Sequence, residues 1–209
     1  MKLLLELFSG TGSVGKVAKD MGFEVVSLDL KNADINCDIM NWDYKQYPVK
    51  HFDMIWASPP CTEYSRAKTT GIRKIDEANK IVLKTIEIIK YFQPTVFIIE
   101  NPQTGLLKSQ PFMDEFSYVD VDYCMYGFNY RKRTRLWNNL VHFTPKKCDK
   151  NCGKMIGNRH IETAQRLPSG TKNDWGENFT KHTQTDLYKI PEKLIYDILE
   201  VCKGYNHHR

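Results

Sequence analysis

The sequence contains no apolar run close to the roughly 18 residues of a membrane-spanning helix, no internal repeat and no low-complexity tract. Its first ten residues, MKLLLELFSG, include a short apolar run but no small-residue cleavage site. We therefore expect a first β-strand here, not a signal peptide. The excess of positive charge is small, 30 basic against 25 acidic residues, which permits nucleic-acid binding without indicating it.

Cysteine is sparse, with six residues in 209, and no export signal accompanies it. A reducing compartment is therefore favoured over a disulfide framework, and each thiol is a core residue, a metal ligand or a nucleophile. Hydrophobic residues make up 41% of the chain, which suffices for a core and excludes a disordered chain. The length predicts one domain with a small appendage.

Strand-like and helix-like patterns alternate over the first 140 residues. Strands are predicted at 2–8, 24–28, 52–57, 95–99, 118–123 and 135–143, and helices at 14–21, 76–92 and 190–201. This alternation predicts an α/β fold, a mostly parallel sheet with helices on both faces. Ligands of such sheets bind at the carboxyl ends of the strands.

The composition changes after about residue 143. Residues 144–187 are rich in Pro, Gly, Asn, Lys and Thr and show little periodicity. We therefore predict a main domain at 1–140, a small irregular C-terminal subdomain at 141–187, and a helix at 188–203 that docks back onto the domain.

A glycine motif, Gly10-Thr11-Gly12-Ser13-Val14-Gly15, directly follows the first predicted strand and opens a helix. An acid, Asp29, ends the next strand and is placed to accept hydrogen bonds from ribose hydroxyls. The pattern indicates a nucleoside cofactor, and at this point a dinucleotide and S-adenosylmethionine both remain open. The simpler alternative is a tight strand-to-helix turn.

Two further strand ends carry reactive side chains. In Ser58-Pro59-Pro60-Cys61 the two prolines fix the backbone and present the thiol at the edge of the sheet. Glu100 follows four apolar residues, and burial there would raise its pKa as a proton donor requires. The alternatives are a small buried cysteine and a capping or surface acid.

A basic stretch, Arg131-Lys132-Arg133-Thr134-Arg135, precedes Leu136. On a strand the three arginines share one face, while Lys132 and Thr134 lie on the other. Three guanidinium groups suit a carboxylate, a phosphate or a base edge, and the alternative is a solvated basic edge.

Cys148 and Cys152 have C-x3-C spacing, and His160 follows them. They lie in the segment least able to form a core, where a structural zinc ion would be useful. His142, Cys124 or His182 could supply the fourth ligand, and the alternative is a pair of loop cysteines without a metal.

Together these motifs resemble the cytosine-5 methyltransferases that act on nucleic acid. The matching pieces, in order, are Leu7-Phe8-Ser9-Gly10-Thr11-Gly12, Cys37-Asp38-Ile39, Ser58-Pro59-Pro60-Cys61-Thr62-Glu63-Tyr64-Ser65, Glu100-Asn101-Pro102, and Tyr126-Gly127 followed by Arg133-Thr134-Arg135. Single pieces are weak, but their order and spacing over about residues 3–137 are specific. The resemblance implies the Rossmann-like class I fold of S-adenosylmethionine-dependent methyltransferases.

The resemblance also implies roles. Cys61 would attack carbon 6 of cytosine, Glu100 would contact ring nitrogen 3 and the exocyclic amine, Arg133 would hold the base carbonyl, and Arg135 would shape their surroundings. S-adenosylmethionine would be bound by Phe8, Ser9, Gly10, Thr11, Gly12, Asp29, Asp38, Ile39, Ser58 and Pro60. DNA, or RNA, would be contacted by Ser65, Arg66, Lys68, Arg73, Lys74 and Arg131, mostly in a loop that closes over a flipped base.

The chain departs from the family pattern in three places. Thr62 and Arg131 replace glutamines, the recognition region shrinks to about residues 138–187, and Tyr188–Leu194 stands where a Gly-Asn element is usual. Short relatives of this kind are carried by phages, other viruses and mobile elements. An RNA methyltransferase, an exocyclic-amino methyltransferase and a catalytically silent nucleic-acid-binding relative remain alternatives. A monomer that is not secreted, in the cytoplasm or the compartment of the host nucleic acid, is the expectation.

Overall fold

The computed structural model describes residues 1–164, 172 and 182–205. Within these residues one sheet of seven strands has the order β3-β2-β1-β4-β5-β7-β6. Its strands are β1 (Leu3–Leu7), β2 (Glu24–Asp29), β3 (Ile35–Asn36), β4 (Met54–Ala57), β5 (Val96–Pro102), β6 (Tyr118–Asp122) and β7 (Arg133–Asn138). β1 to β5 pair in parallel, and β7 pairs antiparallel with both β5 and β6. The predicted mostly parallel, Rossmann-like sheet is confirmed.

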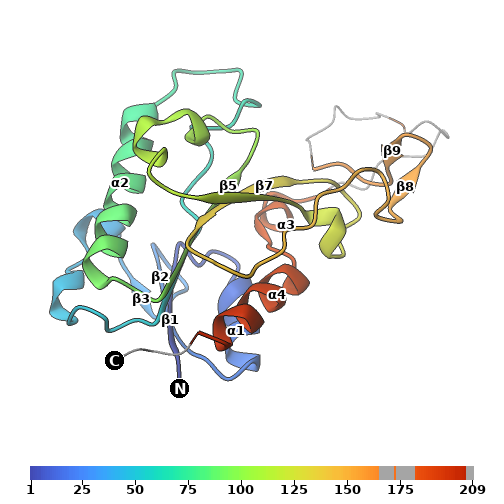
Figure 1. Cartoon of the computed structure of the whole chain (residues 1–209). Helices are drawn as coiled ribbons and strands as arrows, with labels where there is room; N and C mark the ends of the chain where they lie inside the picture. Colours follow the sequence, from blue (N-terminus) through green and yellow to red (C-terminus); the bar gives the residue numbers. More distant parts are fainter. Residues whose placement is uncertain (165–171, 173–181, 206–209) are drawn as a thin grey trace.

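Helices cover both faces of this sheet (Figure 1). α2 (Ile75–Phe92) lies on one face, and α1 (Ser13–Asp20) packs with α4 (Glu192–Lys203) on the other. The buried side chains accordingly form two apolar clusters, one with α2 and one with α1 and α4. Alternate side chains of each strand point into opposite clusters, so central strands such as β1 and β4 are apolar on both faces.

The helix boundaries follow from local chemistry. Gly12 precedes α1 with a φ of 68°, a left-handed conformation that glycine adopts at no steric cost. α2 carries Asp76 and Glu77 in its first turn, where acids complement the helix dipole. Pro191 precedes α4, where its missing N–H leaves no broken hydrogen bond.

The segment after β7 is mostly irregular in its described part. It contains the hairpin of β8 (Met155–Ile156) and β9 (Arg159–His160), which lies at the periphery beyond β6 and β7 (Figure 1), and the short α3 (Gln184–Tyr188). Five 3₁₀ turns complete the described elements: η1 (Ile39–Asn41), η2 (Tyr44–Gln46), η3 (Leu107–Ser109), η4 (Pro111–Met113) and η5 (Tyr123–Tyr126). Among the described helices, none combines the length and apolarity needed to cross a membrane.

Candidate active site

A cavity of about 440 Å³ opens at the carboxyl ends of β1, β2, β4 and β5, the edge at which ligands of parallel sheets bind. Its volume suits a small molecule or cofactor. The predicted residues that line it are Phe8, Ser9, Gly10, Thr11, Asp29, Asp38, Ile39, Ser58, Pro60, Cys61 and Glu100. One cavity therefore joins the predicted cofactor residues to the predicted nucleophile and acid.

The loop after β1 is shaped by positive φ angles, 60° at Phe8, 49° at Gly10 and 68° at Gly12. The Gly10 N–H donates to Asp29 Oδ2 at 2.8 Å, so the carboxylate at the end of β2 holds the glycine loop. The other carboxylate oxygen accepts from the Leu30 N–H at 2.6 Å. Gly12 is absent from the described cavity lining, and its contribution is the turn into α1.

Glu6, in the middle of β1, is a lining residue that the sequence analysis missed. Its side chain is 4% exposed, and Glu6 Oε2 accepts from the Gly15 N–H at 2.9 Å. Burial raises the pKa of this carboxyl to about 7. A carboxylate inside the apolar strand Leu3–Leu7 was the available signal, because a charge there breaks the pattern.

Two of the predicted cofactor residues, Asp38 and Ile39, lie at the start of η1. Asp38 Oδ1 accepts from the Met40 N–H at 2.9 Å, which caps this turn, and Ile39 is buried. Cys37 also lines the cavity. The capping bond fixes the acid beside an apolar wall, an arrangement suited to a base with a polar edge.

The loop that carries Cys61 is anchored on both sides. The buried Asn101 side chain donates through Nδ2 to the Pro59 carbonyl at 2.9 Å. Tyr64 is fully buried and donates its hydroxyl to Asn79 Oδ1 at 2.7 Å. Because both anchors are buried, the cysteine between them is held against the cavity.

The environment of Cys61 favours the thiol over the thiolate. Burial raises the pKa of Cys61, the negative charge of Glu100 raises it further, and the positive charge of Lys132 lowers it. Glu100 is buried, and its Oε1 accepts a hydrogen bond from the Tyr123 hydroxyl at 3.1 Å. The structure thus places the predicted nucleophile, the predicted acid and one lysine close enough to influence one another electrostatically.

The structure places Arg133 and Arg135 on the other face of the sheet from Glu100. β7 pairs Leu136 with Glu100 and Arg135 with Asn101, and paired residues share a face of the sheet. Arg133 and Arg135 therefore lie on the face opposite Glu100, and neither belongs to the described cavity lining.

Arg135 is occupied on its own face. Its guanidinium pairs with Asp120 at 2.7 Å and lies 3.5 Å from the centre of the Tyr118 ring. The cation that lines the cavity is Lys132, whose Nζ donates to the Leu187 carbonyl at 2.9 Å and lies 5.0 Å from the Tyr123 ring centre. The sequence could not show whether Lys132 or Arg133 faces the cavity, because both residues are basic.

The predicted nucleic-acid loop uses two of its cations internally. Lys68 pairs with Glu63 at 2.6 Å, and Arg73 donates to the backbone carbonyls of Glu63, Ser65 and Lys68 at 2.8 to 2.9 Å. In this conformation these two side chains hold the loop together instead of projecting from it. Arg66 and Lys74 are exposed, and Ser65 is half-buried.

Arg131, also predicted as a nucleic-acid contact, makes a two-pronged ion pair with Asp122. Its Nε and Nη2 donate to the two carboxylate oxygens at 2.9 and 2.8 Å. The aspartate is 3% exposed, so breaking the pair would leave a buried charge without a partner. In this structure the arginine therefore links the segment before β7 to the end of β6, and its contact with nucleic acid stays a prediction.

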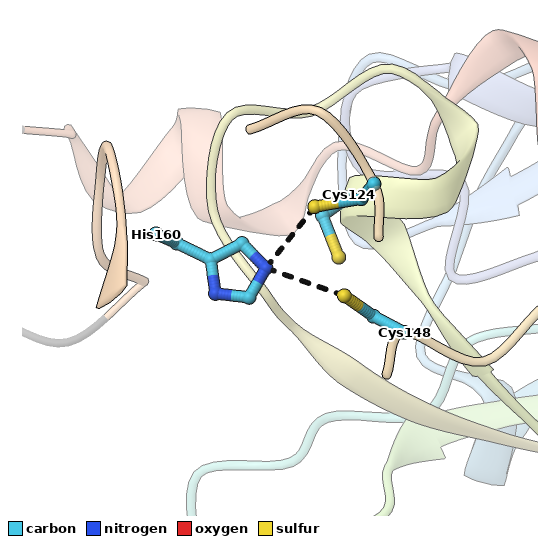
Figure 2. A group of neighbouring side chains, drawn as sticks. Cys124, Cys148 and His160 are labelled. Atoms are coloured by element: carbon cyan, nitrogen blue, oxygen red, sulfur yellow. Dashed lines mark hydrogen bonds between the residues drawn. The ribbon is translucent and has the colours of Figure 1, made fainter. Parts of the chain in front are cut away.

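The three predicted metal ligands lie together, and a fourth thiol joins them. The ligand atoms of Cys124, Cys148, Cys152 and His160 lie within 4.8 Å of one another, and Figure 2 shows side chains from three separate segments converging. His142 is exposed, and His182 pairs with Glu162 at 2.9 Å. Of the candidates for a fourth ligand, Cys124 is the one that lies in this group of described residues.

Residues 4–111 match the family described as C-5 cytosine-specific DNA methylase. A protein of Frog virus 3 (isolate Goorha) named "Probable DNA (cytosine-5)-methyltransferase" is 35% identical over 95% of this chain and 99% of its own length. The type II methyltransferase M.AplI of Arthrospira platensis is 24% identical over 69% of this chain and 43% of its own length.

Among solved structures, the Entamoeba histolytica methyltransferase EhMeth superposes with a TM-score of 0.54 at 16% identity, covering 70% of this chain and 55% of that one. At this identity the likeness shows the fold alone. The chain spans about half the length of these last two relatives, M.AplI and EhMeth, and nearly all of the viral one.

Proposed function

This chain belongs to the family of C-5 cytosine-specific DNA methylases, and from that premise we propose that it transfers a methyl group from S-adenosylmethionine to carbon 5 of cytosine in DNA. One observation carries the proposal at the level of residues. Cys61, Glu100 and Lys132 line the same cavity as the glycine loop and Asp29. A nucleophile, an acid and a cation thus face the space of a nucleoside cofactor.

The residues present fit S-adenosylmethionine. The backbone is left-handed at Phe8 and Gly10, which lets a ligand approach the loop closely. Asp29 offers carboxylate oxygens at the end of β2, and Ile39 supplies an apolar wall beside Asp38. When bound, the cofactor supplies a methyl group on a positively charged sulfur. The carboxylates that line the cavity favour that charge.

The chemistry of cytosine explains why these side chains stand together. Carbon 5 is a weak nucleophile until a thiolate adds to carbon 6, which makes the ring electron-rich. Cys61 loses its proton to water, and the resulting thiolate forms the bond to carbon 6. Glu100 contacts nitrogen 3 and the exocyclic amine, and Lys132 takes the role predicted for Arg133 at the base carbonyl, where negative charge develops. Once carbon 5 carries the methyl group, its proton passes to water, the bond between Cys61 and carbon 6 breaks, and the thiolate and the aromatic ring are restored.

Burial and the charge of Glu100 raise the pKa of Cys61 and so oppose formation of the thiolate. The thiol rests protonated beside Glu100, and Lys132 is the nearby charge that favours the thiolate. A base stacked in a duplex lies out of reach of this half-buried sulfur at the cavity wall, so the target cytosine must be flipped out, at a cost of a few kcal/mol. Arg66 and Lys74 are exposed in the predicted nucleic-acid loop, and they contact the phosphates of the DNA.

The test is transfer of a labelled methyl group to matched DNA and RNA substrates, with identification of the methylated base. We expect 5-methylcytosine in DNA, and no transfer by Cys61→Ala. Transfer that survives this substitution unchanged would contradict the covalent mechanism. Methylation of RNA alone would replace DNA by RNA as substrate, and N4-methylcytosine would indicate amino-group chemistry.

A matched control separates loss of chemistry from loss of fold. Cys37→Ser removes another thiol from the same cavity wall, and it is expected to weaken the cofactor affinity without abolishing transfer. Binding of S-adenosylmethionine by Cys61→Ala, measured calorimetrically, establishes that the cavity is intact. DNA binding without transfer by the unchanged chain would indicate a silent relative. The cofactor proposal also includes a structural zinc ion.

A further inference from the structure

We propose that Cys124, Cys148, Cys152 and His160 form a complete tetrahedral zinc site that fastens the segment after β7 to the active-site strands. The inference is independent of the methyl-transfer proposal, because it rests on this cluster alone. Three thiols and one imidazole are a common ligand set of closed structural zinc sites.

The distances fit a metal at the centre. His160 Nε2 lies 3.4 Å from Cys152 Sγ and 3.6 Å from Cys148 Sγ. Tetrahedral bonds of about 2.3 Å to sulfur and about 2.0–2.1 Å to nitrogen place such atoms about 3.6 Å apart. All four ligand atoms lie within 4.8 Å of one another, so a small local contraction closes the tetrahedron.

The ligands come from three segments that the metal would join. Cys124 lies in η5, Cys148 and Cys152 lie in the irregular loop after β7, and His160 lies in β9 (Figure 2). The loop and hairpin contribute few residues to the two apolar clusters: among residues 144–164 only Cys148 is classed as buried. A segment with so little core needs another source of stability, which a metal provides.

A second layer of contacts surrounds the cluster. The Cys148 N–H donates to Asp122 Oδ2 at 2.8 Å, and Asp122 in turn holds Arg131. Zinc with three thiolates and a neutral imidazole carries one net negative charge. The buried Asp122 and the Arg131 guanidinium balance each other beside it, and ordered outer contacts of this kind accompany metal ligands.

The site lies one residue from the active centre. Tyr123 precedes Cys124, its hydroxyl donates to Glu100, and its N–H donates to the Lys132 carbonyl at 3.1 Å. A metal that fixes Cys124 thereby limits the movement of η5 and of both contacts. We therefore expect zinc to act as a positioning element for Glu100 and Lys132 as well as a fastening for the segment.

The first experiment measures metals in the full chain purified under reducing conditions without chelator. We expect about one zinc per chain. Replacement by cobalt should give the visible absorption of a tetrahedral thiolate site. Zinc below a tenth of the chain concentration together with no cobalt spectrum would overturn the proposal, and iron in place of zinc would overturn the choice of metal.

Substitutions assign the ligands. His160→Ala and Cys152→Ser change half-buried residues and are expected to lower the zinc content at least tenfold after dialysis against a weak chelator. Cys202→Ser, which alters a free buried thiol in α4, is the control and should keep its zinc. Equal zinc in all three variants would show that the metal is held elsewhere.

Because a ligand variant can fail to fold, the unchanged chain supplies a second measurement. Chelator should release zinc, expose three thiols to a thiol reagent and lower the melting temperature, and added zinc should reverse all three changes. Thiol reactivity and melting that do not respond to zinc removal would contradict the fastening role, whatever the outcome of the methyl-transfer assay.

Discussion

The Tyr123 hydroxyl donates a hydrogen bond to Glu100 Oε1 at 3.1 Å, and both side chains are buried. Glu100 lies near the end of β5, and Tyr123 lies in the turn that follows β6. β7 lies between these two strands in the sheet, so the side chains meet across β7. The bond orients the acid toward the cavity. It also connects the proposed chemistry to the turn that carries Cys124.

The first prediction concerns this bond. Tyr123→Phe removes the donor and leaves the ring in place, so we expect kcat to fall roughly tenfold to a hundredfold, the equivalent of about 1.5–3 kcal/mol for a hydrogen bond to a charged group. Methyl-transfer rates at saturating cofactor measure it. Tyr126→Phe is the control, since the Tyr126 hydroxyl accepts from the Lys146 N–H away from the acid. Equal rates for both variants would contradict the orienting role.

The second prediction compares neighbours in the basic stretch. Lys132→Met should lower kcat/KM roughly a hundredfold, the loss seen when one donor to a developing negative charge is removed. Arg133→Met, on the opposite face and exposed, should change it by about twofold or less. Lys132→Arg should restore part of the activity because it keeps the cation. A larger loss for Arg133 than for Lys132 would reinstate the register expected from sequence.

The third prediction follows from Glu6. Burial raises the pKa of Glu6 from 4.5 to about 7, so between these values the folded chain binds more protons than the unfolded chain. The free energy of unfolding therefore falls as pH rises from about 4.5 to about 7, and this contribution is constant above that window.

Glu6→Gln removes the ionisation and keeps an oxygen for the Gly15 N–H. We expect equal stability of the two proteins near pH 4.5 and an advantage for the variant near pH 8, on the order of 3 kcal/mol at most. Urea unfolding across this range measures the difference. Two curves that stay parallel with pH would show that Glu6 is not ionising in the folded chain.

The fourth prediction concerns Gly15. A Cβ at this position would lie 2.6 Å from Glu6 Oε2 and 3.3 Å from Val25 Cγ1, too close for either neighbour to stay. Gly15→Ala should destabilise the chain by about 1–3 kcal/mol despite the better helix propensity of alanine, and it should weaken cofactor binding. Gly204→Ala, whose nearest contact would be an ordinary 3.4 Å, is the control. Thermal melts that rank the two variants equally would contradict the packing argument.

Much of this protein was readable from the sequence because local chemistry settles it. Apolar runs that end in Gly10, Asp29, Cys61 and Glu100 fix both the parallel α/β fold and the edge where reactive groups gather, since side chains at the carboxyl ends of neighbouring strands must meet. The order of these pieces also determined the family, which the comparisons confirmed.

Only the tertiary structure decided which residue of the basic stretch faces the cavity and which cysteines lie together. Whether Lys132 or Arg133 faces Glu100 depends on strand pairing, because a shift of one residue exchanges the faces. In the sequence, Lys68, Arg73 and Arg131 cannot be told apart from unpaired basic residues. Only folding brings each of them to its partner. Cys124 could be matched to Cys148, Cys152 and His160 only in space, since the fold alone brings η5 to the later hairpin.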